Sequence, residues 1–355
     1  MDAITPSQDR LNELLGRAVG DLAAGYAGVL VSIGDKLGLY RAMAGAGPLA
    51  AEDVAARSRC AERYVREWLN AQAAGGYVDY DPATDRFELT AEQAMLFADA
   101  DSPVFLPTAW QVPASMWFDE ERTLETFRHG TGVPWGDHDG RLHCGVAAFY
   151  RNAYKASLVR DWIPALDGIE DRLNAGARVA DIGCGHGHST ILMAKAFPKS
   201  RFWGFDTHAG SIASARDNAR AAGVADHVVF DVSDAATCAS GSFDLVCFFD
   251  CLHDMGDPVG AARRAAGLLA EDGTVMLVEP FANDRLADNL TPVGRLYYAA
   301  STTLCCAHAI SEGGPMALGA QAGEARLAEV FRTAGFGRFR RAHETPFNLI
   351  LEARP

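Results

Sequence analysis

The fold is decided by one segment near the middle of the chain, Val179-Ala-Asp-Ile-Gly-Cys-Gly-His-Gly-His-Ser189. Its apolar start, residues 179–182, predicts a buried parallel strand, and a helical pattern over residues 190–197 follows the glycines. A strand, a glycine turn and a helix bring backbone N–H groups and a helix N-terminus against a bound cofactor. Glycine suits the turn because a Cβ would block that approach and because positive φ is expected there.

The spacing of the glycine turn indicates which cofactor it fits. A dinucleotide-binding turn has the pattern G-x-G-x-x-G/A, but His188 occupies the sixth position here. The residues present are Asp181-x-Gly183-x-Gly185-x-Gly187, which resemble the first motif of class I methyltransferases that use S-adenosylmethionine. We therefore expect S-adenosylmethionine, and not NAD, to bind at these residues.

Four further apolar segments predict strands, at residues 201–206, 228–230, 243–249 and 274–278. Helical patterns lie between them, around residues 210–222 and 258–270. Strands that alternate with helices of this length predict a doubly wound parallel sheet of the α/β class.

Acidic residues at the strand ends are the next candidates for cofactor contacts. Asp206 lies 25 residues after Asp181, close to the spacing of about 20 at which an acid meets ribose hydroxyls in dinucleotide folds. A carboxylate can accept two such hydrogen bonds side by side, although an ordinary polar strand end is the alternative. By resemblance, Asp234, which Ala235 follows, would receive the adenine amino group.

Length and composition agree with a cytoplasmic protein of two parts. A chain of 355 residues exceeds the usual domain size of about 100–150, and a hydrophobic content of 49% excludes disorder. The longest apolar run near the N-terminus, residues 29–33, is far shorter than the roughly 20 residues of a membrane span, and we expect neither a secretory leader nor a membrane partner. The eight cysteines contain no C-x-x-C pair, which favours reduced thiols.

The first hundred residues predict a winged helix. Residues 49–58 and 62–72 predict the two helices of a helix-turn-helix, and residues 77–80 and 87–90 predict the wing hairpin. The helix that would enter DNA carries Arg63 and Arg66, but acidic residues share that helix and load the wing: Glu62, Glu67, Asp79, Asp81 and Asp85.

Charge opposes nucleic acid as a partner. Residues 1–100 hold nine Lys and Arg against fifteen Asp and Glu, a net charge of −6, and the whole chain carries −14. A surface that follows phosphates needs the opposite sign, so we expect the winged helix to have a structural role.

A helix predicted before the winged helix has apolar residues on nearly every face: Leu11, Leu14, Leu15, Val19, Leu22, Tyr26, Val29, Leu30, Val31 and Ile33. A helix that is apolar all round must be buried. Since a small winged helix cannot bury it alone, we expect a homodimer that forms through residues 10–40.

With these features together, residues 10–355 resemble small-molecule methyltransferases of the caffeic acid and hydroxyindole O-methyltransferase type, and bacterial winged-helix methyltransferases more closely. The resemblance implies a seven-stranded Rossmann-like sheet and a winged-helix domain that dimerises and closes part of the partner's active site. The domains it implies are a dimerisation domain at 1–100, a helical linker and substrate cap at 101–165, and a cofactor-binding domain at 166–355, with a cap insertion at 281–321.

The matching segment of most consequence is Asp250-Cys-Leu-His-Asp-Met-Gly-Asp-Pro258, directly after the fourth strand. Ligands of open α/β sheets bind beyond the carboxyl ends of the strands, so this loop faces the cofactor and Asp250 is a candidate contact. The family has a His-Asp-aromatic triplet here, and its histidine deprotonates the acceptor. His253 and Asp254 match, whereas Met255 replaces the aromatic residue that covers the adenine.

Two glutamates flank the histidine in the family, and Glu279 and Glu324 match them by resemblance. A neutral imidazole, with a pKa near 6.5, can take a phenol proton at neutral pH, and a carboxylate behind it fixes the tautomer. We therefore expect methyl transfer to a hydroxyl of a small molecule. The alternatives are that His253 caps a helix or bonds a carbonyl, and that a sulfur, nitrogen or carbon acceptor needs no base.

The insertion at 281–321 is long for a connection and predicts a substrate cap. It contains Cys305, Cys306 and His308, which raise the possibility of a metal site. Adjacent cysteines rarely hold one zinc ion, so we expect these residues to line the pocket, with no metal. Two other functions compete: a ligand-sensing transcription regulator would need a basic DNA-binding face, and an inactive scaffold subunit would be expected to lose Asp181, Asp206 or His253.

Overall fold

The structure is a computed structural model that describes residues 6–238 and 241–355. The chain divides into two compact units, Met1–Gln111 and Val112–Pro355. Each unit is described by itself.

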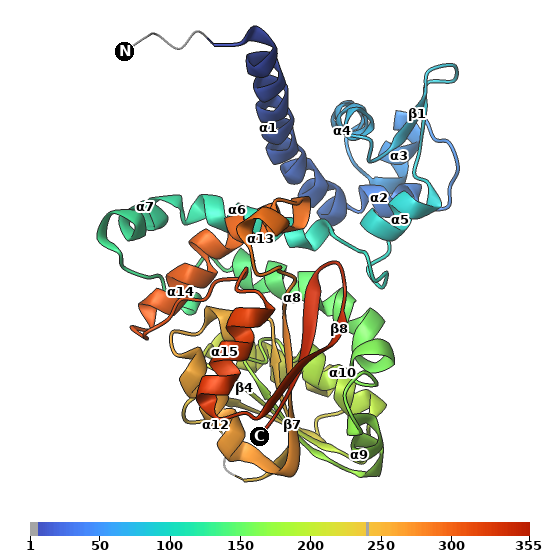
Figure 1. Cartoon of the computed structure of the whole chain (residues 1–355). Coiled ribbons are helices and arrows are strands. Elements are labelled where there is room, and N and C mark those ends of the chain that lie inside the picture. The colour runs from blue at the N-terminus through green and yellow to red at the C-terminus, as the bar shows by residue number, and fades with distance from the viewer. Residues whose placement is uncertain (1–5, 239–240) are drawn as a thin grey trace, which may run out of the picture. The chain divides into compact units, whose positions relative to one another are not determined.

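The larger unit is built around a seven-stranded sheet in the order β5-β4-β3-β6-β7-β9-β8 (Figure 1). Its strands are β3 (Arg178–Ile182), β4 (Arg201–Asp206), β5 (Val228–Val232), β6 (Phe243–Phe249), β7 (Leu269–Pro280), β8 (Arg338–Glu344) and β9 (Asn348–Arg354). Strand β9 is antiparallel to both β7 and β8, and the other pairs are parallel. The prediction of a doubly wound, seven-stranded α/β sheet is confirmed.

Helices cover both faces of this sheet because its central strands are apolar on both sides. One face packs on the π-helical segment η3 (Tyr154–Trp162), α9 (Ile169–Ala175), α10 (His188–Ala196) and α11 (Ala209–Ala221). The opposite face packs on α12 (Pro258–Leu268) and α15 (Glu324–Ala334). Successive residues of β6, such as Leu245 and Val246, therefore point to opposite faces and belong to different cores.

All but one of the remaining helices of this unit lie in the linker (101–165) or in the insertion (281–321), and the exception is η4. They are α6 (Gln111–Phe118), which begins at the last residue of the smaller unit, α7 (Glu120–His129), η2 (Trp135–Asp137), α8 (Arg141–Ala153), η4 (Leu252–Asp254), η5 (Leu286–Asn289), α13 (Pro292–Thr303) and α14 (Cys305–Ser311). The short η4 follows β6 directly and carries the candidate histidine.

The strand order switches between the neighbouring strands β3 and β6: the chain continues from β3 to β4 and β5 on one side of the sheet, and from β6 to β7 on the other. Ligands of open α/β sheets bind at such a switch point, beyond the carboxyl ends of the strands. The glycine turn follows β3, and φ is +75° at Gly183, +52° at Gly185 and +74° at Gly187. A Cβ on Gly187 would lie 2.6 Å from the ring of Phe230, so the turn requires glycine for space as well as for φ.

The smaller unit contains the winged helix. Its elements are α1 (Gln8–Leu37), α2 (Leu39–Met43), α3 (Ala51–Ser58), α4 (Glu62–Ala74), β1 (Asp79–Asp81), β2 (Arg86–Glu88), α5 (Ala91–Phe97) and η1 (Pro107–Trp110). Helices α3 and α4 form the helix-turn-helix, and β1 pairs with β2 as the wing. Its core includes Tyr40, stacked on Phe97, and Trp68, so the predicted winged helix is confirmed.

Helix α1 is anchored only near its C-terminal end. Gly28 lies against Trp110 and Gly34 lies against Trp68, where a Cβ would meet each indole within 2.6 Å. Before this point its apolar side chains are exposed in the single chain, for example Leu14 at 61% and Tyr26 at 70%. By length and composition α1 is also the one helix among the described residues that could cross a membrane, a property that N-terminal signal sequences and core helices of soluble proteins share.

Both arginines of the second helix are already paired. Arg63 pairs with Glu67 at 2.6 Å, and Arg66 pairs with Glu62 and Glu52, each at 2.7 Å. Arginines that are held by carboxylates on their own surface are less available for phosphate.

We therefore predict that the chain binds duplex DNA no better than a generic acidic protein, because there is little counterion release to drive binding. Fluorescence anisotropy with labelled duplexes at physiological salt measures this. Sequence-dependent binding at submicromolar concentration would contradict the structural role of the winged helix.

Candidate active site

The loop after β6 begins at a strained aspartate. Asp250 has φ +51°, in the left-handed region that residues other than glycine rarely occupy. Its carboxyl accepts hydrogen bonds from the Tyr154 hydroxyl at 2.8 Å and from the Asn348 side-chain amide at 2.7 Å. Burial raises the pKa of Asp250 well above its ordinary value. This residue fixes the exit of the chain from β6.

His253 is held from behind by a buried glutamate. Its Nδ1 lies 2.5 Å from Oε2 of Glu279, near the end of β7, and both side chains are under 5% exposed. The other oxygen of Glu279 accepts a hydrogen bond from the backbone N–H of Leu252 at 3.1 Å. One carboxylate therefore orients the ring and also fixes the short helix that carries it.

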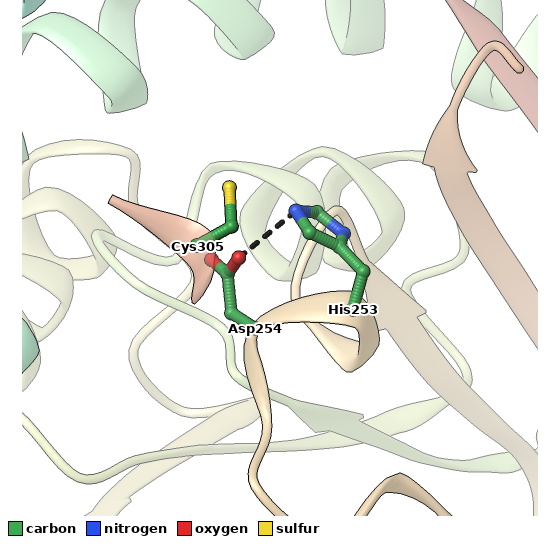
Figure 2. Close-up of side chains that lie close together, drawn as sticks. All are labelled: His253, Asp254 and Cys305. Atoms are coloured by element: carbon green, nitrogen blue, oxygen red, sulfur yellow. Dashed lines mark ion pairs between the residues drawn. The ribbon is translucent and has the colours of Figure 1, made fainter. Parts of the chain in front are cut away.

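The opposite side of the ring faces a second carboxylate and a thiol (Figure 2). Nε2 of His253 lies 3.0 Å from Oδ1 of Asp254, which is an ion pair when the ring is protonated. That oxygen is buried and is not aligned for a hydrogen bond. The thiol of Cys305, the first residue of α14, lies beside both side chains, so Nε2 faces a polar cluster.

The charge of this ring is set by competing effects. Burial alone lowers the pKa of His253, but the carboxylates of Asp254 and Glu279 outweigh burial and raise it well above its ordinary value. The same pairing lowers the pKa of Asp254 although burial opposes it. The two carboxylates therefore favour the protonated form of the ring, which burial alone would disfavour.

The glycine turn presents polar groups beyond β3. Oδ2 of Asp181 accepts hydrogen bonds from Ser189 at 2.7 Å and Thr190 at 2.5 Å, whereas its Oδ1 is buried without a partner. Burial raises the pKa of Asp181 to about 6. A Cβ on Gly185 would meet no atom within 4 Å, so open space adjoins the middle of the turn.

Asp206, at the end of β4, is tied to the same turn. One of its oxygens accepts the backbone N–H of Gly185 at 2.9 Å and the other accepts the N–H of His208 at 2.8 Å. The carboxylate is half-exposed, so its remaining lone pairs are available to hydroxyl groups.

The other predicted cofactor contacts lie around the same strand ends. Oδ1 of Asp234 closes a local turn by accepting the N–H groups of Ala236 and Thr237. Ala235 and Met255 are both half-buried against the core that contains α12.

The insertion at 281–321 is bonded to the His253 loop. The N–H of Gly319 donates to the carbonyl of His253 at 3.2 Å, and Gly256 is held by Glu312 and Met316. His308 accepts the backbone N–H of Trp135 at 3.2 Å, which connects α14 to the linker. The insertion therefore packs directly against the candidate site.

Comparisons with known proteins assign both parts of the chain. Residues 173–335 match the model of a methyltransferase domain, and residues 25–98 match that of an Rv2258c-like winged HTH domain. The chain combines a winged-helix domain with a methyltransferase domain. This confirms the resemblance inferred from the sequence motifs.

Individual relatives are more distant. The 27-O-demethylrifamycin SV methyltransferase of Amycolatopsis mediterranei is 37% identical over 107 residues, which are 30% of this chain and 39% of that enzyme. Such matches span about half or less of the curated relatives. Human N-acetylserotonin methyltransferase, solved with S-adenosylmethionine, has a TM-score of 0.71 at 16% identity and covers 100% of this chain and 99% of its own. An O-methyltransferase family protein from Burkholderia thailandensis has a TM-score of 0.68 at 20% sequence identity. The match covers 99% of this chain and 98% of that protein.

Within the methyltransferase domain, one residue predicted to flank His253 lies against a different partner. Glu324, the first residue of α15, forms an ion pair with Arg341 of β8. His253 instead has Glu279 and Asp254 as its two carboxylate neighbours. The carboxylate of Glu324 is directed to β8 because α15 packs beside that strand, so we correct its assignment as a flanking residue.

Sequence reasoning missed Tyr154 and Asn348, which hold Asp250, and it did not bring Cys305 to His253. Asn348 is 98 residues from Asp250, and nothing in its neighbourhood indicates the contact. A possible signal for Tyr154 was the aromatic pair that it forms with Tyr150, four residues earlier on the same helical face.

We predict that His253 keeps its proton above its ordinary pKa of about 6.5, and that Glu279→Gln lowers this pKa by removing one negative neighbour. Because the folded-state pKa is raised, the associated stability is full below about pH 6.5 and is lost as pH rises through the folded value. NMR titration of the ring measures the shift. Glu324→Gln is the matched control and should change nothing; an equal effect of both variants would contradict the assigned contacts.

Proposed function

We propose that this chain transfers the methyl group of S-adenosylmethionine to a hydroxyl group of a small molecule. The observation that carries the proposal is the buried His253–Glu279 pair at the switch point of a methyltransferase sheet. The comparisons support it, since the structural neighbours include O-methyltransferases, among them the mitomycin 7-O-methyltransferase, which is 19% identical.

The residues present fit S-adenosylmethionine. The unpartnered oxygen of Asp181 suits an ammonium donor, and the half-exposed carboxylate of Asp206 suits ribose hydroxyls. Gly183, Gly185 and Gly187 carry no side chain and adopt positive φ. Asp234, Ala235 and Met255 are assigned to the adenine, and Asp250 is a candidate contact of the cofactor.

The proposed catalytic step is removal of the acceptor proton. The cofactor supplies an electrophilic methyl group, so the chain has only to align the acceptor and to accept one proton. Glu279 holds the proton on Nδ1, which leaves Nε2 of the neutral His253 ring as the proton acceptor. The flanking carboxylates of Asp254 and Glu279 then stabilise the imidazolium that forms.

Other acceptors and another function remain as competing proposals. A thiol or amine that is already nucleophilic would use the same cofactor site without His253 as base. A ligand-sensing regulator would use the winged helix on DNA, and the paired arginines of α4 argue against it.

We predict binding of S-adenosylmethionine and S-adenosylhomocysteine in about the micromolar range and no binding of NAD. Asp206→Ala should weaken binding by about 1.5–3 kcal/mol, the value of a charged hydrogen bond, and calorimetry measures it. Asp231→Ala is the control because that carboxylate pairs with Arg216 on the surface. Unchanged affinity in Asp206→Ala would remove this acid from the site.

On a hydroxyl acceptor, His253→Asn should lower kcat by roughly 10²–10⁴-fold, the usual contribution of a positioned base, while cofactor affinity stays nearly constant. Glu279→Gln should cause a smaller loss, because it orients the ring without taking the proton. The wild-type rate should rise with pH through the raised pKa of His253, since only the neutral ring accepts a proton. Near-normal turnover of the Asn variant would demote His253 to a pocket residue.

We also propose that the protein is a cytoplasmic homodimer. The eight cysteines are free, as expected of a reducing compartment. The exposed apolar side chains of α1 form a surface that a second copy would cover through residues 10–40.

Accordingly, Leu22→Asp should weaken self-association, because Leu22 is 59% exposed on α1 and its charge would be buried in the dimer. Tyr64→Ala, at an exposed site on α4, should leave the dimer unchanged. Analytical ultracentrifugation measures both, and a wild-type monomer at micromolar concentration would refute the proposal.

A further inference from the structure

Three potential metal ligands lie close together, and one of them is the proposed base His253. Nε2 of His253, a carboxylate oxygen of Asp254 and Sγ of Cys305 all lie within 4.8 Å of one another (Figure 2). Two of them come from η4 after β6, and the third begins α14 of the insertion, 51 residues later. The fold therefore assembles a set of nitrogen, oxygen and sulfur donors that no local motif contains.

We propose that His253, Asp254 and Cys305 bind a thiophilic divalent cation, with Zn²⁺ as the best match. Zn²⁺ takes these donor types at about 2.0–2.3 Å, and sites with three protein ligands leave a fourth position open. Hard cations such as Mg²⁺ prefer oxygen donors and are a poor match to the thiol.

The surroundings of His253 support a metal ligand. A histidine that binds a metal through one ring nitrogen commonly donates its other N–H to a carboxylate, which fixes the tautomer and the ring orientation. Glu279 makes this contact at Nδ1, and it leaves Nε2 directed at Asp254. The oxygen of Asp254 that faces Nε2 at 3.0 Å is buried and makes no aligned hydrogen bond, so it is positioned to share a cation with the ring.

Charge permits a divalent cation at the same place. Asp254 and Glu279 both face one imidazole ring, so the cluster carries two negative charges against at most one positive charge. A divalent cation would displace the proton of the Cys305 thiol as well as that of the ring, so its two positive charges replace two protons and the net charge of the cluster stays the same.

The consequence is that a cation and a proton compete for Nε2 of His253. The metal-bound chain cannot use this nitrogen as a base, so we expect the cation to inhibit transfer to a hydroxyl. Binding of the cation itself does not depend on methyl transfer, which allows the two proposals to fail separately.

The test uses the full-length chain without an affinity tag, freed of metal by a chelator. Co²⁺ should bind one ion per chain and give the absorption of thiolate-to-metal charge transfer, and Zn²⁺ should displace it. Cys305→Ser should abolish the charge-transfer band and weaken Zn²⁺ binding at least 10-fold. The matched control is Cys306→Ser, on the same helix, where the thiol contacts Ser301 instead, and it should behave as wild type.

A second variant guards against misfolding. Glu279→Gln keeps all three ligands and should weaken Zn²⁺ roughly 10- to 100-fold, as loss of an outer partner does. S-adenosylhomocysteine binding, measured on the same samples, reports whether the domain is folded and whether the cofactor assignment holds. Absence of Co²⁺ absorption, or equal affinities in Cys305→Ser and Cys306→Ser, would overturn the metal site even where the cofactor binds normally.

Discussion

The structure of the candidate site depends on the buried contact between Glu279 and the loop after β6. Glu279 lies near the end of β7, which neighbours β6 in the sheet, so adjacent parallel strands deliver a carboxylate and a histidine to the same edge. The carboxylate bonds both to the ring of His253 and to the backbone of Leu252. A change at this single residue therefore alters the orientation, the tautomer and the charge of the histidine together.

The same contact creates an electrostatic problem that the domain must resolve. Burying two carboxylates beside one ring is costly unless a positive charge accompanies them. A proton on His253 can supply that charge, because the carboxylates raise the pKa of the ring, and a protonated base must release its proton before it can act. The proposed cation would satisfy the carboxylates in a different way, and this explains why catalysis and metal binding would exclude each other at Nε2.

The insertion and the linker give the site its boundary. Helix α14 brings Cys305 to the histidine, and Gly319 and Glu312 bond to the same loop. These contacts join residues that are 52 to 66 positions apart. At Gly314 a Cβ would lie 2.1 Å from the Gly256 carbonyl, and this tight approach leaves little freedom for the loop to move. The acceptor must therefore enter a site whose base is held rigidly from both sides.

The sequence by itself determined the elements of the sheet and the glycine turn, and the resemblance of its motifs to a family indicated His253 and Glu279 as partners. The strands and the turn are local features, because apolar runs form strands and glycine permits positive φ. Only the tertiary structure decided that Asp254 rather than Glu324 is the second carboxylate at the ring, that Tyr154 and Asn348 fix Asp250, and that Cys305 reaches His253. Those contacts join side chains across different strands and helices, and their geometry follows from packing angles that no sequence spacing records.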